Sequence, residues 1–251
     1  LPSPSSHTLQ RLRQMVVENG YDLGIGTDGD ADRVGIIDSN GKFVHPNEIL
    51  VLLYYYLLKY KGWKGGVVRN VATTHLLDRI AEAFGEECYE VPVGFKHISS
   101  KMEEKNALIG GESSGGLTIR GHIKGKDGIF AASLLIELIS KTGKTLSGLL
   151  DEIHNEFGCY YTSECDLKFT ADDKPRLIKK LMEDREIPSY YYDIERVSYM
   201  DGLKIYFKNG GWVVARFSGT EPLLRIVSEM NTQKEADTVV GMMKDFLEAE
   251  V

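Results

Sequence analysis

Apolar residues recur with a helical period in several segments of residues 47–156, and short apolar runs separate these segments. The pattern predicts helices at 47–60, 74–84, 95–105, 129–141 and 145–156, and strands at 66–71, 87–91 and 107–109. Helices that alternate with strands are typical of an α/β fold with a mostly parallel sheet. We therefore expect a three-layer α/β domain in this part of the chain.

The pattern changes after about residue 158, where strands follow one another with fewer helices between them. It predicts a strand at 160–169, a helix at 173–185, three strands within 193–229 and a final helix at 233–249. This order is typical of a smaller α+β domain with an antiparallel sheet. A helix at 8–19 and two short apolar strands open the chain.

These changes of pattern predict two boundaries, near residues 42 and 158. Residues 1–42 are then an opening segment, residues 43–157 the α/β domain, and residues 158–251 the α+β domain. The chain begins with leucine, and its first residues, LPSPSSHT, resemble a linker that enters a helix. We therefore expect the chain to be cut from a longer one.

Composition narrows the classes of function. The 251 residues include 42% hydrophobic residues, enough for packed cores, and carry a formal net charge of −7. Basic residues form no run longer than a pair, which argues against binding to nucleic acid or to an anionic membrane. The apolar stretch 49–58 is about half the length of a membrane span, and we expect a buried helix there.

The three cysteines, Cys88, Cys159 and Cys165, are odd in number and form no CxxC pair. They therefore indicate neither a disulfide framework nor a zinc site. Thiols without either role are typical of a reducing compartment, so we expect a cytoplasmic protein.

The stretch GTDGDADRVG has three aspartates at alternate positions, Asp28, Asp30 and Asp32, in the loop between the first two predicted strands. Hard cations prefer oxygen ligands, and a tight loop can turn such carboxylates toward one point. The spacing predicts a magnesium site, with a solvated acidic turn as the alternative. An EF-hand is excluded because Arg33 and Ser39 stand where that loop needs glycine and glutamate. Arg33 either balances the carboxylates or holds a phosphate.

A second candidate loop is GGESSGG, residues 110–116, between a predicted strand and a helix. Glu112 can accept hydrogen bonds from two hydroxyls, and Ser113 or Ser114 can donate or accept, which suits vicinal sugar hydroxyls. A flexible connector is the alternative.

The segment after this loop carries candidate proton-transfer groups. These are His122, Lys124 and Lys126, with Asp127 beside them. Their alternative is a solvated rim.

A third loop lies in ARFSGTEPLLRIVSE, residues 215–229. Backbone N–H groups, two hydroxyls and one or two guanidiniums can form a phosphate cradle there, although no Walker sequence is present. The residues concerned are Arg216, Ser218, Gly219, Thr220 and Arg225. A hairpin with a surface arginine is the alternative. Together the three loops predict a sugar-phosphate site in a cleft between domains.

The three motifs TDGDADR, GGESSGG and RFSGTEP resemble, in order and spacing, those of the α-D-phosphohexomutases, the phosphoglucomutase/phosphomannomutase family. The resemblance extends over essentially the whole chain. It implies a four-domain enzyme that interconverts hexose 1-phosphate and hexose 6-phosphate. A phosphoserine in the first domain donates the phosphoryl group, and a hexose 1,6-bisphosphate is the intermediate and activator.

Carried over by motif, the resemblance implies a role for each loop. Asp28, Asp30 and Asp32 would hold Mg²⁺ beside the phosphoserine, with Arg33 next to them. Glu112 and Ser114 would bind sugar hydroxyls, and VPVGFKHI adds Lys96 as a further substrate-binding candidate. The phosphate that does not react would be held by Arg216, Ser218, Gly219, Thr220 and Arg225.

Two departures from the family pattern matter. Gly116 stands where many members have a histidine, which favours the phosphoglucomutase side of the family, hence glucose. It also leaves the general acid/base unassigned, with His122, Lys124 and Lys126 as candidates, and the catalytic residues that we predict are Arg33, His122 and Lys126. No TASHNP-like serine motif occurs, so we expect the phosphoserine on the missing N-terminal domains and no turnover by this chain alone.

The leading hypothesis is the C-terminal part of a phosphohexomutase. The alternative is a non-catalytic module or subunit that binds sugar phosphates. A metal-dependent phosphatase is a weaker third, because Asp32 stands where that class has a threonine.

Overall fold

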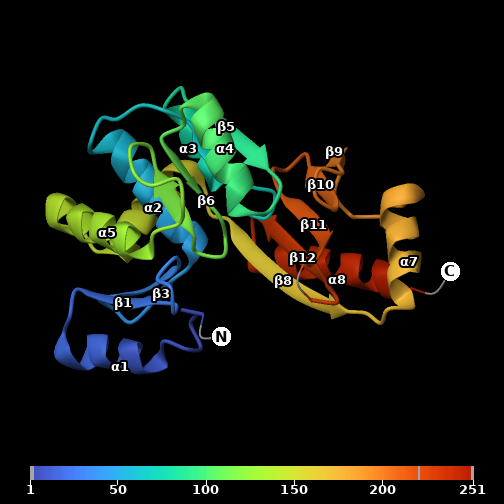
Figure 1. The fold of residues 1–251 in the computed structure, drawn as a ribbon, viewed down its shortest axis with the longest axis horizontal. Coiled ribbons are helices and arrows are strands. Elements are labelled where there is room, and N and C mark those ends of the chain that lie inside the picture. Colours follow the sequence, from blue (N-terminus) through green and yellow to red (C-terminus); the bar gives the residue numbers. More distant parts are fainter. Residues whose placement is uncertain (1–2, 220, 250–251) are drawn as a thin grey trace. The chain divides into compact units, whose positions relative to one another are not determined.

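The computed structural model describes residues 3–219 and 221–249. The chain divides into two compact units, Leu1–Gly158 and Cys159–Val251, and each is described here by itself (Figure 1). Within the described residues, no helix is long and apolar enough to cross a bilayer.

The first unit opens with a small antiparallel sheet of order β1-β2-β3, formed by β1 (Leu23–Thr27), β2 (Val34–Asp38) and β3 (Phe43–Val44). Helix α1 (Gln10–Asn19) covers one face of this sheet (Figure 1). The contact is close, because a Cβ atom at Gly24 would lie 2.6 Å from a Val16 methyl and 3.0 Å from Leu12.

The second sheet of this unit has the order β5-β4-β6-β7. Its strands are β4 (Val67–Asn70), β5 (Cys88–Val91), β6 (Ile109–Gly111) and β7 (Leu117–Ile119). Strand β4 pairs in parallel with β5 and β6, and β7 pairs antiparallel to β6. The predicted, mostly parallel sheet is confirmed; β7, only three residues long, was not predicted.

Helices cover both faces of this sheet, as two neighbouring glycines of β6 indicate. A Cβ atom at Gly110 would meet Ile98 and Met102 of α4 (Phe95–Lys105), whereas one at Gly111 would meet Leu50 of α2 (Pro46–Lys59). Successive residues of a strand point to opposite faces, so α4 and α2 lie on opposite sides. The three-layer arrangement is therefore confirmed.

Helix α2 is the centre of the unit, with every residue from Ile49 to Leu58 buried. It packs against the remaining helices, α3 (Leu76–Ala83), α5 (Gly128–Thr142) and α6 (Leu146–Phe157). Helix α5 also contacts β1 and β2, which brings the start of α5 to the loop between these strands.

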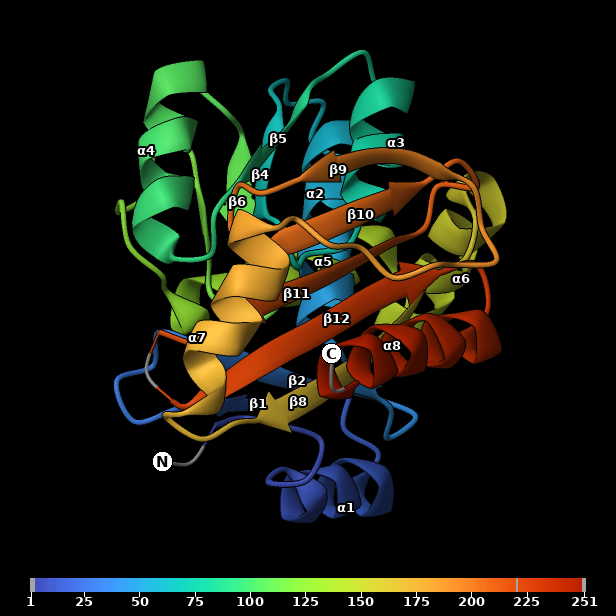
Figure 2. The same ribbon diagram turned by 90° about the vertical axis from the view of Figure 1, so that its right-hand side faces the viewer.

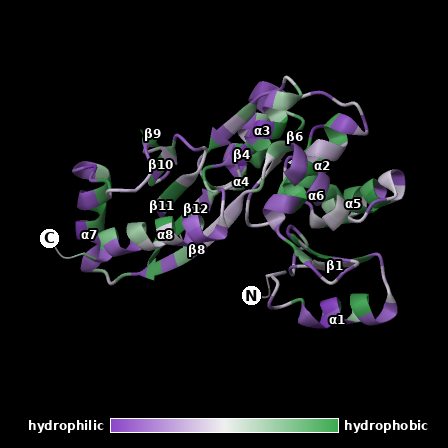
Figure 3. Cartoon of the chain, turned by 180° about the vertical axis from the view of Figure 1, so that it is seen from behind, coloured by the Kyte–Doolittle hydropathy of each residue, from purple (hydrophilic) through white to green (hydrophobic). Residues whose placement is uncertain are grey.

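The second unit is a five-stranded antiparallel sheet of order β8-β12-β11-β10-β9, as the predicted fold class requires. Its elements are β8 (Tyr161–Lys168), α7 (Asp173–Ile178), a π-helical turn (Lys179–Glu183), β9 (Ile194–Ser198), β10 (Leu203–Phe207), β11 (Trp212–Phe217), β12 (Leu223–Met230) and α8 (Gln233–Glu248). Figure 2 shows α7 and α8 on one face of this sheet. In Figure 3, α8 carries both hydrophobic and hydrophilic residues, as expected for a helix that covers a sheet.

Two predictions for this unit were wrong in detail. Four strands, β9 to β12, stand where three were expected, because β9 is a half-exposed edge strand without a clear apolar alternation. The helix predicted at 173–185 is α7 followed by the π-helical turn and ends at Glu183.

Candidate functional site

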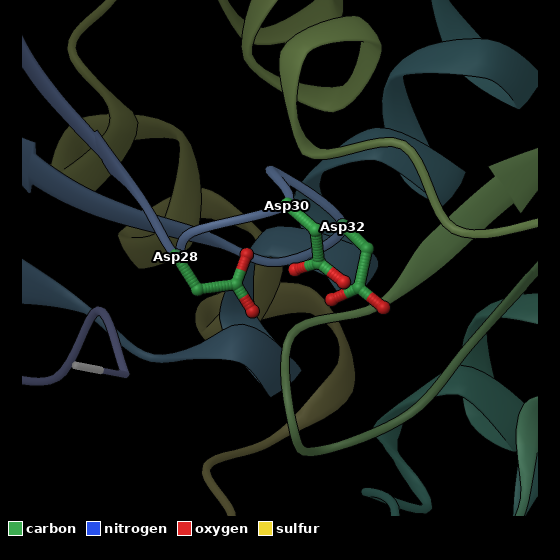
Figure 4. A group of neighbouring side chains, drawn as sticks. All are labelled: Asp28, Asp30 and Asp32. Carbon is green, nitrogen blue, oxygen red and sulfur yellow. The ribbon is translucent and has the colours of Figure 1, made fainter. Parts of the chain in front are cut away.

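The aspartate loop joins β1 to β2. One ligand oxygen from each of Asp28, Asp30 and Asp32 lies within 4.8 Å of the others. Figure 4 shows the three carboxylates directed toward a common space. Asp28 and Asp32 are partly buried and Asp30 is exposed, so the group is open on one side.

Local hydrogen bonds hold this loop in shape. Ala31 has the left-handed backbone conformation, φ 57°, and its N–H donates to the Asp28 carbonyl at 3.2 Å. The Arg33 N–H donates to Asp28 Oδ1 at 3.1 Å. The Arg33 Nε atom lies 3.6 Å from Asp28 Oδ2 and 3.7 Å from Asp32 Oδ1, so the guanidinium partly balances the carboxylate charge.

The donor set fits a hard divalent cation. Asp32 Oδ1 is buried and accepts no hydrogen bond, with Arg33 Nε at 3.7 Å as its charged neighbour, so this oxygen is available as a metal ligand. Three carboxylates in reach of one point, with no sulfur or imidazole ligand among them, suit Mg²⁺.

The segment before α5 lies directly against this loop. Lys126 Nζ forms an ion pair with Asp32 Oδ2, and the Gly128 N–H donates to the Ala31 carbonyl at 2.9 Å. A side chain does not fit at position 128, because its Cβ would lie 2.8 Å from the Arg33 carbonyl oxygen and 2.9 Å from that of Ala31. Glycine therefore permits the close approach of the two segments.

Gly116, which stands where many members of the resembled family have a histidine, also permits a close approach, here of the Lys126 side chain. A Cβ atom there would overlap Lys126 Cδ and would lie 2.7 Å from its Cγ. The lysine stem thus occupies the space that a side chain at position 116 would need.

His122 and Lys124, the other two proton-transfer candidates, form their contacts outside the aspartate loop. His122 Nε2 hydrogen-bonds to Asp127 Oδ2 at 2.8 Å, and its ring stacks on Phe130 at 3.9 Å. Lys124, 73% exposed, pairs with Glu103 of α4 at 2.6 Å. Of the three candidates, Lys126 is the one that contacts the aspartate loop.

Asp127 caps α5. Its Oδ1 accepts the Phe130 N–H at 2.8 Å. This bond, together with the one from His122, lowers the pKa of the Asp127 carboxyl.

The GGESSGG loop connects β6 to β7. The Glu112 N–H donates to the Gly116 carbonyl and the Gly115 N–H to the Glu112 carbonyl, each at 3.0 Å, which closes a tight turn. Glu112 is buried, at 9% exposure, and accepts a hydrogen bond from Asn70 Nδ2 at 3.4 Å. Ser113 is half-buried and Ser114 exposed.

Lys96 is exposed in the first turn of α4, the helix that follows β5. Since β4, β5 and β6 are parallel, the segments after them lie at one edge of the sheet, where ligands bind in such folds. Asn70, at the end of β4, belongs to this edge and was not among the predicted site residues. The sequence signal for it is a polar residue at the end of an apolar strand.

In the second unit, the phosphate-loop candidates surround the end of β11 and the start of β12. Arg216 and Arg225 stand directly opposite each other in these strands, so both guanidiniums are on the same face. Arg216 Nε lies 3.2 Å from Asp201 Oδ2, and Arg225 Nη2 lies 3.3 Å from Glu221 Oε2. The loop is closed by the Ser218 N–H, which donates to the Leu223 carbonyl at 2.9 Å, and Gly219 is exposed. Thr220 lies outside the described residues.

Comparison with family models matches three segments of the chain to one family. The model described as phosphoglucomutase/phosphomannomutase, alpha/beta/alpha domain III matches residues 45–157. The family's C-terminal domain matches residues 167–246, and its alpha/beta/alpha domain II matches residues 1–41.

Individual relatives agree with this result. The chain is 33% identical over 235 residues to a phosphoglucomutase/phosphomannomutase of Thermococcus kodakarensis, covering 94% of this chain and 49% of that protein. It is also 33% identical over 235 residues to a probable phosphoglucosamine mutase of Methanopyrus kandleri, covering 94% of this chain and 50% of the relative.

A solved structure shares the fold. The phosphoglucomutase/phosphomannomutase family protein of Burkholderia thailandensis superposes with a TM-score of 0.80 at 23% identity, covering 98% of this chain and 51% of that one. The chain thus spans about half the length of the relatives it matches. The resemblance seen in the sequence is confirmed, and the chain belongs to the phosphoglucomutase/phosphomannomutase family.

Proposed function

We propose that the chain is the C-terminal part of a phosphohexomutase that interconverts hexose 1-phosphate and hexose 6-phosphate through a hexose 1,6-bisphosphate. The phosphoserine that donates the phosphoryl group belongs to a domain outside these 251 residues. The observation that carries this proposal is the ion pair between Lys126 and Asp32, since it joins the aspartate loop to the segment that follows the sugar loop.

In this proposal Asp28, Asp30 and Asp32 hold Mg²⁺. When bound, the cation supplies positive charge that offsets the charge of a transferring phosphoryl group. Arg33 lies against two of these carboxylates and adds a fixed positive charge at the same point.

Lys126 is the group that moves a proton, because its ammonium is already beside the aspartate loop. The role of His122 is to position the segment: its ring is fixed between Phe130 and Asp127, and Asp127 caps the helix that begins next to Lys126.

Sugar hydroxyls bind Glu112 and Ser114, with Lys96 at the same edge of the sheet. Arg216, Ser218, Gly219, Thr220 and Arg225 hold the phosphate that does not react. Arg216 and Arg225 stand at opposite positions of adjacent strands, and a phosphate dianion between them exchanges with the carboxylates of Asp201 and Glu221 that pair with them in this structure.

Glucose is the hexose we propose, because Gly116 with Lys126 folded over it follows the phosphoglucomutase side of the resemblance. We assign residues 1–42 to the tail of the second domain, 43–157 to the third and 158–251 to the fourth. The free thiols of Cys88, Cys159 and Cys165 suit a cytoplasmic enzyme.

The first test is the intact mass and the activity of the native, untagged protein from its source. A mass about twice that of this chain, with conversion of glucose 1-phosphate to glucose 6-phosphate in Mg²⁺, supports the proposal. A native protein no larger than this chain that binds hexose phosphates without turnover contradicts it and favours a non-catalytic binding module.

The second test is calorimetric titration of the chain with glucose 1,6-bisphosphate. Arg216→Ala removes a charged hydrogen-bond donor and is expected to weaken binding about tenfold or more. Arg11→Ala, on the exposed face of α1, is the matched control and is expected to bind as the wild type does. Equal affinity in Arg216→Ala would contradict the proposed phosphate-binding role of Arg216.

A further inference from the structure

Asn70 and Glu112 are neighbours at the carboxyl edge of the parallel sheet. Arg69 of β4 is in register with Gly111 of β6, so the next residue of each strand, Asn70 or Glu112, follows at the same edge. Both side chains are buried, at 2% and 9% exposure. Asn70 Nδ2 donates to Glu112 Oε2 at 3.4 Å.

The orientation of the Asn70 amide is determined by the turn after β4. Its Oδ1 accepts the Ala72 N–H at 2.9 Å and the Thr73 hydroxyl at 2.9 Å. A backbone N–H can only donate, so the atom facing Ala72 must be the oxygen. The NH₂ group therefore faces Glu112.

The strand that carries Asn70 is held by an ion cluster around the buried Arg69. Arg69 donates to both Asp78 oxygens at 2.7 and 2.9 Å and to Glu90 at 2.6 Å. Burial opposes the charge of Arg69, but these two carboxylates raise its pKa and keep the cluster ionised. The amide of Asn70 thus projects from a rigid strand end.

We propose that Asn70 is a positioning residue for sugar binding, a proposal that rests on the function proposed above. Its amide occupies Glu112 Oε2 and leaves Oε1 to accept a sugar hydroxyl. Oε1 is on the Gly116 side of the loop, 3.5 Å from the position of a Cβ there, next to the stem of Lys126. The Asn70 amide is an uncharged donor and adds no negative charge beside Glu112. Both Glu112 oxygens therefore remain hydrogen-bond acceptors.

Asn70→Asp tests this directly. The aspartate keeps an oxygen for Ala72 and Thr73 and exchanges only the group that faces Glu112. Two carboxylates then face each other and repel. Glu112 and the introduced aspartate form a hydrogen bond only when one proton is shared between them. The charged groups next to the pair are Arg69, which bonds the Asn70 carbonyl, and Lys126.

For the variant, we expect glucose 1-phosphate affinity relative to wild type to fall about tenfold near pH 8 and to recover to within about threefold near pH 5.5. The wild-type measurement at each pH removes the titration of the ligand itself. Asn19→Asp, at the exposed end of α1, introduces the same charge away from the site and is expected to match the wild type at both pH values.

A second readout needs no sugar. Titration of the Glu112 carboxyl carbon by NMR is expected to give a higher pKa in Asn70→Asp than in the wild type and no change in Asn19→Asp. Thr73→Val, which removes one donor to Oδ1 without changing charge, is expected to weaken sugar binding by a smaller factor.

The outcomes separate the two proposals. A wild-type chain that binds no hexose phosphate overturns the proposed sugar site of this chain, and the NMR titration still tests whether Asn70 faces Glu112. The positioning role is overturned if the wild-type chain binds hexose phosphate and a folded Asn70→Asp variant shows the same affinity and the same Glu112 titration. If Asn70→Asp does not fold, Thr73→Val with wild-type affinity overturns it.

Discussion

The ammonium group of Lys126 forms an ion pair with the Asp32 carboxylate, although the two residues belong to loops far apart in the sequence. The contact joins the aspartate loop between β1 and β2 to the segment that begins α5. The hydrogen bond from the Gly128 N–H to the Ala31 carbonyl joins the same two segments. A cation therefore already lies at the edge of the proposed metal site.

Removal of the Lys126 ammonium group is expected to strengthen metal binding. In Lys126→Ala, Asp32 loses a competing positive charge, so the affinity of the chain for Mg²⁺ should rise about three- to tenfold at low salt. Calorimetric titration with Mg²⁺ measures the change. Lys124→Ala is the matched control, because that ammonium pairs with Glu103 on α4, and unchanged affinity in Lys126→Ala would contradict the proposed site.

The aspartate loop itself is tested by Asp30→Asn. This exposed residue has the same size as asparagine, so the fold should be unaffected, but the loss of one charged oxygen ligand should lower Mg²⁺ affinity at least about tenfold. Asp22→Asn, an exposed change just before β1, serves as the comparison. If both variants bind Mg²⁺ as the wild type does, the three carboxylates are a solvated acidic turn.

Asp38 is expected to stabilise the first unit. It is fully buried at the end of β2, and its Oδ2 accepts the Ser147 N–H at the start of α6 at 2.9 Å. Asp38→Ala leaves this donor without a partner and should lower the free energy of unfolding by about 2 kcal/mol, measured by urea denaturation. Asp151→Ala, on the exposed side of α6, should change it little; equal stability of the two variants would contradict the prediction.

The stability that Asp127 contributes should depend on pH. The Phe130 N–H and His122 lower the pKa of Asp127 in the folded state, so its contribution is present above the unfolded pKa and is lost as pH falls through the folded one. The amide oxygen introduced by Asp127→Asn can still cap α5, so the difference in unfolding free energy from wild type reports the charge. That difference should be about 0.5 kcal/mol near pH 5, because solvent screens the charge, and should shrink toward pH 3. A constant difference would mean that the charge is not involved.

Much of the fold was predictable because helices and strands leave local periodic patterns. The alternation between residues 47 and 156 predicted the three-layer unit, and the change of pattern near 158 predicted the antiparallel sheet. The exceptions were β3, β7 and β9. The first two are strands of two and three residues and β9 is a half-exposed edge strand, and such segments leave too little periodicity.

For the candidate site, the sequence by itself determined what adjacent residues can express: three carboxylates at alternate positions of one loop, and the composition of the sugar and phosphate loops. Only the tertiary structure showed which of His122, Lys124 and Lys126 contacts Asp32, that the Lys126 stem fills the space beside Gly116, and that Asn70 faces Glu112. The physical reason is that these contacts join residues distant in the chain. They exist only because parallel strands end at one edge and α5 packs against the first sheet.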